Sequence, residues 1–178
     1  MAIEERNDAL KRNMSKPLAR YEFADRVLPK DILVGDIGCG TGYGRTILEN
    51  RKRKVIGLDK QNVIEQARID YPGEYIGIDL DDKSIVSYEF GAVVCLETLL
   101  HLKEPEYFLS KLKCNHLVIS AAIDTDPNDG YIYRLHNVSE DQFKKMLIGR
   151  WIVKDEMWQH CGEKENYLVI YAQSSNNR

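Results

Sequence analysis

The chain has 178 residues with 25 basic and 28 acidic side chains, so its formal net charge is -3 with histidine neutral, and this balance selects no partner. At about 150 residues per domain, the length predicts one domain over residues 1–178, and 43% hydrophobic residues can fill its core. No stretch approaches the roughly 20 uncharged apolar residues that cross a bilayer, and the first residues lack the apolar core of a secretory signal. We therefore expect a soluble, cytoplasmic protein with no membrane partner.

The cysteines and histidines show no spacing of a structural metal or disulfide site. The four cysteines, at positions 39, 95, 114 and 161, make no CxxC pair, and the four histidines do not cluster with them in a zinc-finger spacing. We expect neither a disulfide scaffold nor a bound metal.

The first thirty residues alternate charged and apolar groups in a helical rhythm that Pro29 closes. This pattern predicts one or two N-terminal helices over residues 1–30, which form a cap. The basic run at residues 51–54 is the densest in the chain, and we interpret it as a solvated helix end and loop whose cations complement a helix C-terminus.

Short apolar runs then recur between charged stretches of helical character. The runs do not alternate with polar residues, which is typical of strands buried on both faces. They lie at residues 32–37, 55–58, 75–78, 92–96 and 116–123, and helices are predicted after Gly42, after Gln61, after Pro105 and, from a weaker pattern, around residues 83–88. This order predicts a parallel sheet with helices on both faces.

The C-terminal part has a different pattern. Ser139 precedes Phe143 and Met146 as a capping residue precedes an amphipathic helix. The strand-like runs 151–159 and 166–172 are separated by too few residues for a helical crossover, so they should pair as an antiparallel hairpin. The fold class is therefore α/β, a doubly wound seven-stranded sheet, mostly parallel with an antiparallel C-terminal hairpin strand. Residues 174–178 are predicted to be a frayed tail, and the long irregular stretch 124–137 to be a functional loop.

A glycine-rich turn, Asp36-Ile37-Gly38-Cys39-Gly40-Thr41-Gly42, joins the first predicted strand to the helix after it. Glycines at alternate positions let a ligand lie against bare main chain, and the helix start offers free N–H groups. The dinucleotide fingerprint would need glycine at position 43, where Tyr43 stands, which argues against a nicotinamide oxidoreductase. No Gly-Lys-Ser/Thr follows at the spacing of a phosphate-binding loop.

Three acidic residues follow three of the predicted strands. Asp36 enters the turn, Asp59 ends the second strand and Asp79 ends the third. In doubly wound sheets the carboxyl edge binds ligands, and an acid after the second strand commonly accepts hydrogen bonds from ribose hydroxyls. Three carboxylates repel a pyrophosphate and favour a cationic ligand, so an adenosine derivative with a positive charge fits this edge.

These residues resemble the class I S-adenosylmethionine-dependent methyltransferases, and in particular small domains of the methyltransferase type 11/12 kind, from about Arg20 to the C-terminal hairpin. The resemblance implies a Rossmann-like fold with S-adenosyl-L-methionine as cofactor. It implies cofactor-binding roles for the turn, for the acids at the strand ends and for the start of the segment after the fourth strand, namely Asp36, Gly38, Gly40, Gly42, Asp59, Lys60, Asp79, Leu80, Cys95 and Leu96. Two positions depart from the family pattern: Gly35 replaces a large aliphatic residue, and Phe90-Gly91 replaces a Phe-Asp pair.

Methyl transfer needs the acceptor and the methyl group held in line, and an acceptor that carries a proton also needs a base. We rank His136 first, because the residues around it resemble the family's loop after the fifth strand, ahead of Glu97, His101 and Asp124. The residues predicted to lie on the acceptor side are Tyr21, Glu97, His101 and Tyr133.

The sequence excludes some acceptors and leaves others open. It has neither the Asn/Asp-Pro-Pro-Tyr/Phe motif that grips a base amino group nor a Pro-Cys loop, which argues against methylation of nucleic-acid bases. We predict methyl transfer to an oxygen or nitrogen of a small-molecule or sugar-type acceptor. Two alternatives stay open: a non-catalytic S-adenosylmethionine-binding regulatory or scaffold subunit, and an RNA 3′-terminal ribose methyltransferase. In the latter, Glu97 and His101 on one helical face would hold a divalent cation with His136, although Leu100 stands where that family has a further ligand.

Overall fold

The computed structural model describes residues 17–82, 88–126, 134–161 and 166–175. Residues 1–16 of the predicted cap, most of the predicted helix around residues 83–88, and Tyr133 lie outside the described residues. Among the helices of the described part, none combines the length and the apolar character needed to span a membrane.

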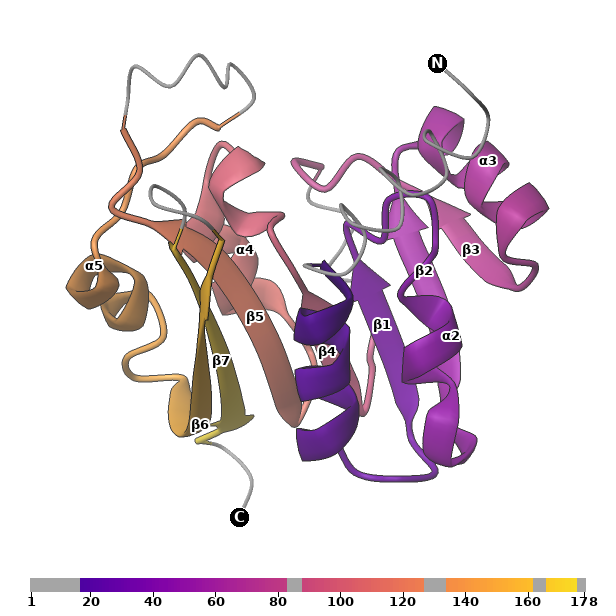
Figure 1. The fold of residues 1–178 in the computed structure, drawn as a ribbon, viewed down its shortest axis with the longest axis horizontal. Helices are drawn as coiled ribbons and strands as arrows, with labels where there is room; N and C mark the ends of the chain where they lie inside the picture. The colour runs from indigo at the N-terminus through magenta and orange to yellow at the C-terminus, as the bar shows by residue number, and fades with distance from the viewer. Residues whose placement is uncertain (1–16, 83–87, 127–133, 162–165, 176–178) are drawn as a thin grey trace.

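The centre of the molecule is a seven-stranded sheet with the order β3-β2-β1-β4-β5-β7-β6 (Figure 1). Neighbouring strands from β3 to β5 pair in parallel, whereas β7 pairs antiparallel with both β5 and β6. The predicted fold class is thus confirmed, including the C-terminal hairpin. The strands are β1 (Leu33–Ile37), β2 (Lys54–Asp59), β3 (Glu74–Gly77), β4 (Ala92–Cys95), β5 (His116–Ile123), β6 (Trp151–His160) and β7 (Asn166–Ser174).

Helices cover both faces of the sheet, as the strand-helix order predicts. The helical residues 17–27 and α2 (Arg45–Leu48) lie in front of the sheet in Figure 1, and α3 (Gln61–Asp70) packs against β2 and β3. On the other face, α4 (Pro105–Lys111) and α5 (Glu140–Lys145) bury their apolar residues in a second cluster. Short 3-10 turns, η1 (Asn50–Lys52) and η3 (Leu99–His101), complete the connections.

Local signals define the ends of several elements. The Ser139 hydroxyl accepts the Gln142 N–H at 3.3 Å, and the Gln142 side chain accepts the Ser139 N–H at 2.8 Å, so α5 starts with the predicted cap, closed as a reciprocal capping box. Ser174 still belongs to β7, and the Ser175 N–H donates to the Arg150 carbonyl at 2.8 Å. The predicted frayed tail therefore does not include these two residues.

Gly35 of β1 lies against the ring of Phe90. A Cβ atom at this position would lie 2.7 to 2.9 Å from three ring carbons of Phe90, closer than real contacts allow. The Phe90 ring, which is 6% exposed, thus occupies the space that a side chain at position 35 would need. The other departure, Gly91, has different neighbours, because a Cβ atom there would lie 3.1 Å from Ile32 Cβ and 3.3 Å from the Leu33 carbonyl oxygen.

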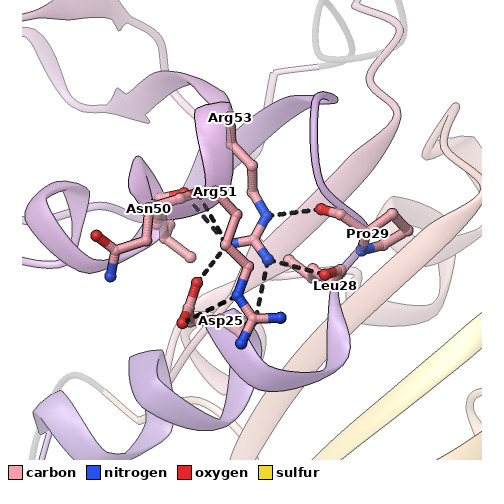
Figure 2. Close-up of polar contacts among 7 residues, drawn as sticks. Asp25, Leu28, Pro29, Asn50, Arg51 and Arg53 are labelled. Atoms are coloured by element: carbon pink, nitrogen blue, oxygen red, sulfur yellow. Dashed lines mark hydrogen bonds and ion pairs between the residues drawn. The ribbon is translucent and has the colours of Figure 1, made fainter.

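Arg53 corrects our interpretation of the basic run as a solvated segment. Its side chain is buried, and its guanidinium donates to the Asp25 carboxylate at 2.6 Å and to the main-chain carbonyls of Asp25, Leu28 and Pro29 at 2.7 to 2.8 Å (Figure 2). These carbonyls end the helix at residues 17–27, where four groups lack helical partners. As expected, a cation of this run complements a helix C-terminus. This cation is the buried Arg53, which joins the end of that helix to the start of β2.

Candidate active site at the carboxyl edge of the sheet

A cavity of about 450 Å³ opens where β1, β2, β3 and β4 end. Seven of the residues predicted to bind the cofactor line it, together with the predicted acceptor-side residues Glu97 and His101. The full lining is Gly38, Gly40, Tyr43, Asp59, Lys60, Asp79, Leu80, Asp81, Leu96, Glu97, Thr98, His101 and Leu102. The other predicted cofactor residues, Asp36, Gly42 and Cys95, are buried behind this wall.

The glycine turn exposes its main chain to the cavity. Gly40 has a φ of +55°, and a Cβ atom built on it would meet no atom within 4 Å, so the main chain there borders open space. The Gly40 N–H donates to Asp59 Oδ2 at 2.8 Å, and the Lys60 N–H donates to Asp59 Oδ1 at 2.7 Å. Each carboxylate oxygen of Asp59 keeps a lone pair that a ligand hydroxyl can use.

The cavity has the volume and the charge for a cationic nucleoside. Its size lies within the roughly 300–1,000 Å³ typical of small-molecule sites. Four carboxyl side chains line it, from Asp59, Asp79, Asp81 and Glu97, against one lysine, Lys60. A sulfonium adenosine compound fits such a lining better than a pyrophosphate does, because like charges repel at short range.

Asp36 lies beneath the turn and faces the N-terminal helix. The Tyr21 hydroxyl donates to both oxygens of its carboxylate, at 3.2 and 3.3 Å. Burial raises the pKa of Asp36 to about 7, with a further rise from Asp59, while the Tyr21 hydrogen bond and Arg45 lower it. The predicted acceptor-side residue Tyr21 is only 3% exposed, and it connects the helix to the glycine turn instead of lining the cavity.

Glu97 stands at the end of β4 in a strained main-chain conformation. Its φ is +57°, a region that side chains other than glycine rarely adopt. Its carboxylate accepts the hydroxyl of the buried Ser120 at 2.5 Å, and the same hydroxyl oxygen accepts the Glu97 N–H at 3.0 Å. Burial raises the pKa of Glu97 above its usual range, against the lowering effect of Arg20, the Ser120 hydrogen bond and His101. A buried, strained acid that faces a cavity is typical of functional sites.

The histidines differ from the sequence expectation. We predicted that Glu97 and His101 share one helical face, but this is wrong, because only residues 99–101 form a short 3-10 turn and Glu97 precedes it with left-handed backbone. His136 Nε2 lies 2.9 Å from the Leu102 carbonyl oxygen, so Nε2 carries a hydrogen and donates it to that oxygen. His136 is not among the residues that line the cavity. Its hydrogen bond fixes the main chain of Leu102, which does line it.

Sequence reasoning missed several residues of this site. Tyr43, Thr98, Asp81 and Leu102 line the cavity, and Ser120 fixes Glu97. Ser120 carried a signal, since it is the one hydroxyl inside the apolar run of β5 and is fully buried.

Comparison with known proteins supports the family resemblance. Residues 35–113 match the family model described as a methyltransferase domain, a segment that contains the glycine turn, Asp59, Asp79 and Glu97. No curated protein sequence matches the chain.

Solved structures share the fold at low sequence identity. The magnesium protoporphyrin IX methyltransferase ChlM from Synechocystis PCC 6803, crystallised with S-adenosylhomocysteine, is 19% identical with a TM-score of 0.71, covering 98% of this chain and 89% of that one. The N-methyltransferase NodS from Bradyrhizobium japonicum WM9, also with S-adenosylhomocysteine, is 16% identical with a TM-score of 0.68, covering 93% and 87%. The [4+2]-cyclase SpnF is 15% identical with a TM-score of 0.66, covering 83% and 76%.

The protein therefore has the class I S-adenosylmethionine-dependent methyltransferase fold, and the resemblance predicted from its sequence is confirmed. The segment that matches the methyltransferase domain model, residues 35–113, runs from β1 through α4 of this fold. The name of the cyclase among the neighbours shows that this fold also serves other reactions, so the reaction has to be argued from the site.

Proposed function

We propose that the protein is an S-adenosylmethionine-dependent methyltransferase that acts on an oxygen or nitrogen of a small-molecule or sugar-type acceptor. One observation carries this proposal: the acid-lined cavity at the carboxyl edge of the sheet, with the glycine turn on one wall and the buried acid Glu97 on another. The first wall suits a cationic adenosine compound, and the second gives a place for an acceptor to lose a proton.

The residues that would hold the cofactor follow from their positions. The main chain of Gly38 and Gly40 borders the cavity beside Asp59, whose free lone pairs suit the ribose hydroxyls. Asp79 and Leu80 follow β3 on the same wall and would hold adenine. When bound, S-adenosylmethionine supplies an electrophilic methyl group on a sulfonium sulfur.

Glu97 is the side chain best placed to take a proton from the acceptor. It lines the cavity, Ser120 fixes its carboxylate, and burial raises its pKa, which makes the carboxylate a stronger base than an exposed one. We ranked His136 first from the sequence, but one of its ring nitrogens donates to the Leu102 carbonyl. His136 thus contacts a residue of the cavity lining and does not itself line the cavity. We therefore place Glu97 ahead of His136.

Calorimetric titration tests the cofactor site. Wild type should bind S-adenosylmethionine and S-adenosylhomocysteine with micromolar affinity, and Asp59→Ala should weaken both by about tenfold or more. Asp141→Ala, which removes an exposed carboxylate from the first turn of α5, is the control and should bind as wild type does. No binding by wild type would refute the proposal.

A transfer assay separates the enzyme from a non-catalytic binding subunit. Incubating the protein with methyl-labelled S-adenosylmethionine and small-molecule cell extract should label an acceptor. Glu97→Gln should keep cofactor affinity and lower kcat by about 10²–10⁴, whereas Glu106→Gln on the exposed face of α4 should not change it. Tight cofactor binding without any labelled product would favour the regulatory or scaffold alternative.

The RNA ribose methyltransferase alternative receives little support from the site. In the part of the chain that the structure describes, no three His, Cys, Asp or Glu side chains gather as a metal site requires. Glu97 directs its carboxylate to Ser120, and Leu100 is buried in the core. We do not propose it further.

A further inference from the structure

A second cavity, of about 330 Å³, lies where β5 and β6 end and β7 begins. It is lined by Ile123, Asp124, Trp158, His160 and Asn166, and it shares no lining residue with the cofactor cavity at the ends of β1 to β4. Its volume is at the lower end of the roughly 300–1,000 Å³ of small-molecule sites, so it suits a small ligand.

The register of β5, β7 and β6 places the strand residues of this cavity on one face of the sheet (Figure 1). Asn166 pairs with His160 on one side and with Ile123 on the other, and Trp158 lies two residues before His160. Residues that pair directly, and residues two apart on one strand, point to the same face. This is the face that α5 covers, because Ile123 and Phe143 of α5 belong to one buried cluster.

Trp158 gives the cavity an aromatic wall. Its ring lies parallel to the His160 ring, with 6° between the planes and 6.3 Å between the centroids, and the residue is 36% exposed. His160 Nδ1 lies 2.6 Å from Asn166 Oδ1, and this hydrogen bond fixes the imidazole. The stacking fixes the indole in turn. An indole is the side chain whose ring face attracts cations most strongly.

The acidic side chains give this region a negative charge. Asp124 is exposed, and within the described ranges no ion pair occupies its carboxylate and no lysine or arginine lines the cavity. Farther along the same face of β6, Glu156 lies two residues before Trp158 and shares Lys144 with Glu140, at 2.8 and 2.7 Å. Two carboxylates against one ammonium leave a negative charge there too, so the cavity attracts a cation and repels an anion.

We propose that this cavity binds the ammonium group of a small organic cation, with the cation against the Trp158 indole and Asp124 as its counter-charge. An alkylated ammonium suits the lining better than a metal ion does, because the indole and Ile123 offer apolar contacts to alkyl groups, whereas a single carboxylate gives a metal ion too few oxygen ligands. The site would take a second ligand beside the cofactor, so the proposal goes beyond the proposed function and does not depend on it.

NMR of the indole N–H groups tests this assignment directly. Protein labelled with nitrogen-15, at about pH 7.5 where ordinary imidazoles are mostly neutral, is titrated with tetramethylammonium chloride at constant ionic strength. Sodium chloride is the salt control, and tert-butanol is a neutral compound of similar shape. The Nε1–H signal of Trp158, identified by its absence in Trp158→Leu, should shift in a saturable way with tetramethylammonium alone, with a Kd of the order of 1–10 mM. Trp151, which is 5% exposed, is the internal control, and its signal should not move.

Variants separate the roles of the charge and the ring. Asp124→Asn removes the charge at nearly constant size, and asparagine tolerates the left-handed backbone of this position, whose φ is +51°. The tetramethylammonium affinity of this variant and of Trp158→Leu, followed by the backbone amide signals of His160 and Asn166, should fall by about fivefold or more. Asp141→Asn, at the exposed start of α5, is the matched control and should bind as wild type does.

The titration is run with and without saturating S-adenosylhomocysteine, because the cofactor cavity is also lined by acids. A response that S-adenosylhomocysteine abolishes would place the cation in the cofactor cavity and overturn the proposal. A Trp158 signal that does not respond, or that responds equally to tert-butanol, would also overturn it, as would equal affinities of Asp124→Asn and wild type. Failure of wild type to bind S-adenosylmethionine in calorimetry would instead refute the proposed function, and it leaves this measurement unchanged.

Discussion

Replacing Arg53 with methionine should lower the free energy of unfolding far more than the same replacement at its neighbour Arg51. Arg53 is buried and donates to the Asp25 carboxylate and to the carbonyls of Asp25, Leu28 and Pro29 at 2.6 to 2.8 Å. Methionine fills much of the same space but donates nothing, so a mostly buried carboxylate and three carbonyls lose their partner.

The magnitude follows from these contacts. Breaking a buried pair by removing one partner destabilises a protein by about 3–5 kcal/mol, and an unsatisfied carbonyl adds to this. Such a loss is a large part of the roughly 5–15 kcal/mol that stabilises a typical domain. For a chain of this length it corresponds to a fall in Tm of about 6–20 °C.

Urea denaturation followed by circular dichroism measures this loss. Arg51→Met is the control, since Arg51 Nε lies 3.7 Å from Asp25 and its side chain is 40% exposed, which predicts a loss of less than about 1 kcal/mol. If Arg53→Met also loses less than about 1 kcal/mol, the reasoning on the buried guanidinium is wrong.

Three further predictions concern the fold and the turn. Burial raises the pKa of Asp36 from 3.8 to about 7, so the stability of wild type should fall as pH rises between these values. Asp36→Asn should remove this dependence on pH. In urea denaturation the variant should be more stable than wild type by a few kcal/mol at about pH 8 but not at about pH 4. Equal slopes would contradict the role of burial. Gly35→Ala should destabilise by about 1–3 kcal/mol through its clash with Phe90, and by less in a Phe90→Leu background, which a double-mutant cycle measures. Ser139→Ala should cost about 1 kcal/mol in thermal unfolding through loss of the capping box, and an unchanged Tm would speak against it.

The elements that depend on local patterns were predictable. The buried apolar runs, the glycine turn and the Ser139 cap each carry their information within a few neighbouring residues, and they lie where the sequence places them. The acids at strand ends were also predictable, because Asp59 and Asp79 follow strands whose parallel pairing brings their ends together.

The side chains that the sequence did not predict depend on distant partners. Arg53 finds the carbonyl of Pro29 24 residues away, so a basic run that looks solvated contains a buried member. Glu97 has left-handed backbone instead of the helix expected from the sequence, and its carboxylate accepts a hydrogen bond from Ser120, 23 residues further along the chain. Periodicity describes neighbours in sequence and holds no information on such contacts.

The insertion of β7 between β5 and β6 has a consequence for synthesis of the chain. Of the seven strands, β7 is the last to be made, yet it pairs with β5 along all eight residues from His116 to Ile123. Until β7 has emerged, β5 presents an open edge whose residues are almost all apolar, the kind of edge that joins to other chains. The nascent protein is thus most exposed to aggregation just before its sheet closes, and substitutions that weaken the β5-β7 pairing should reduce the yield of folded protein before they affect the cofactor cavity.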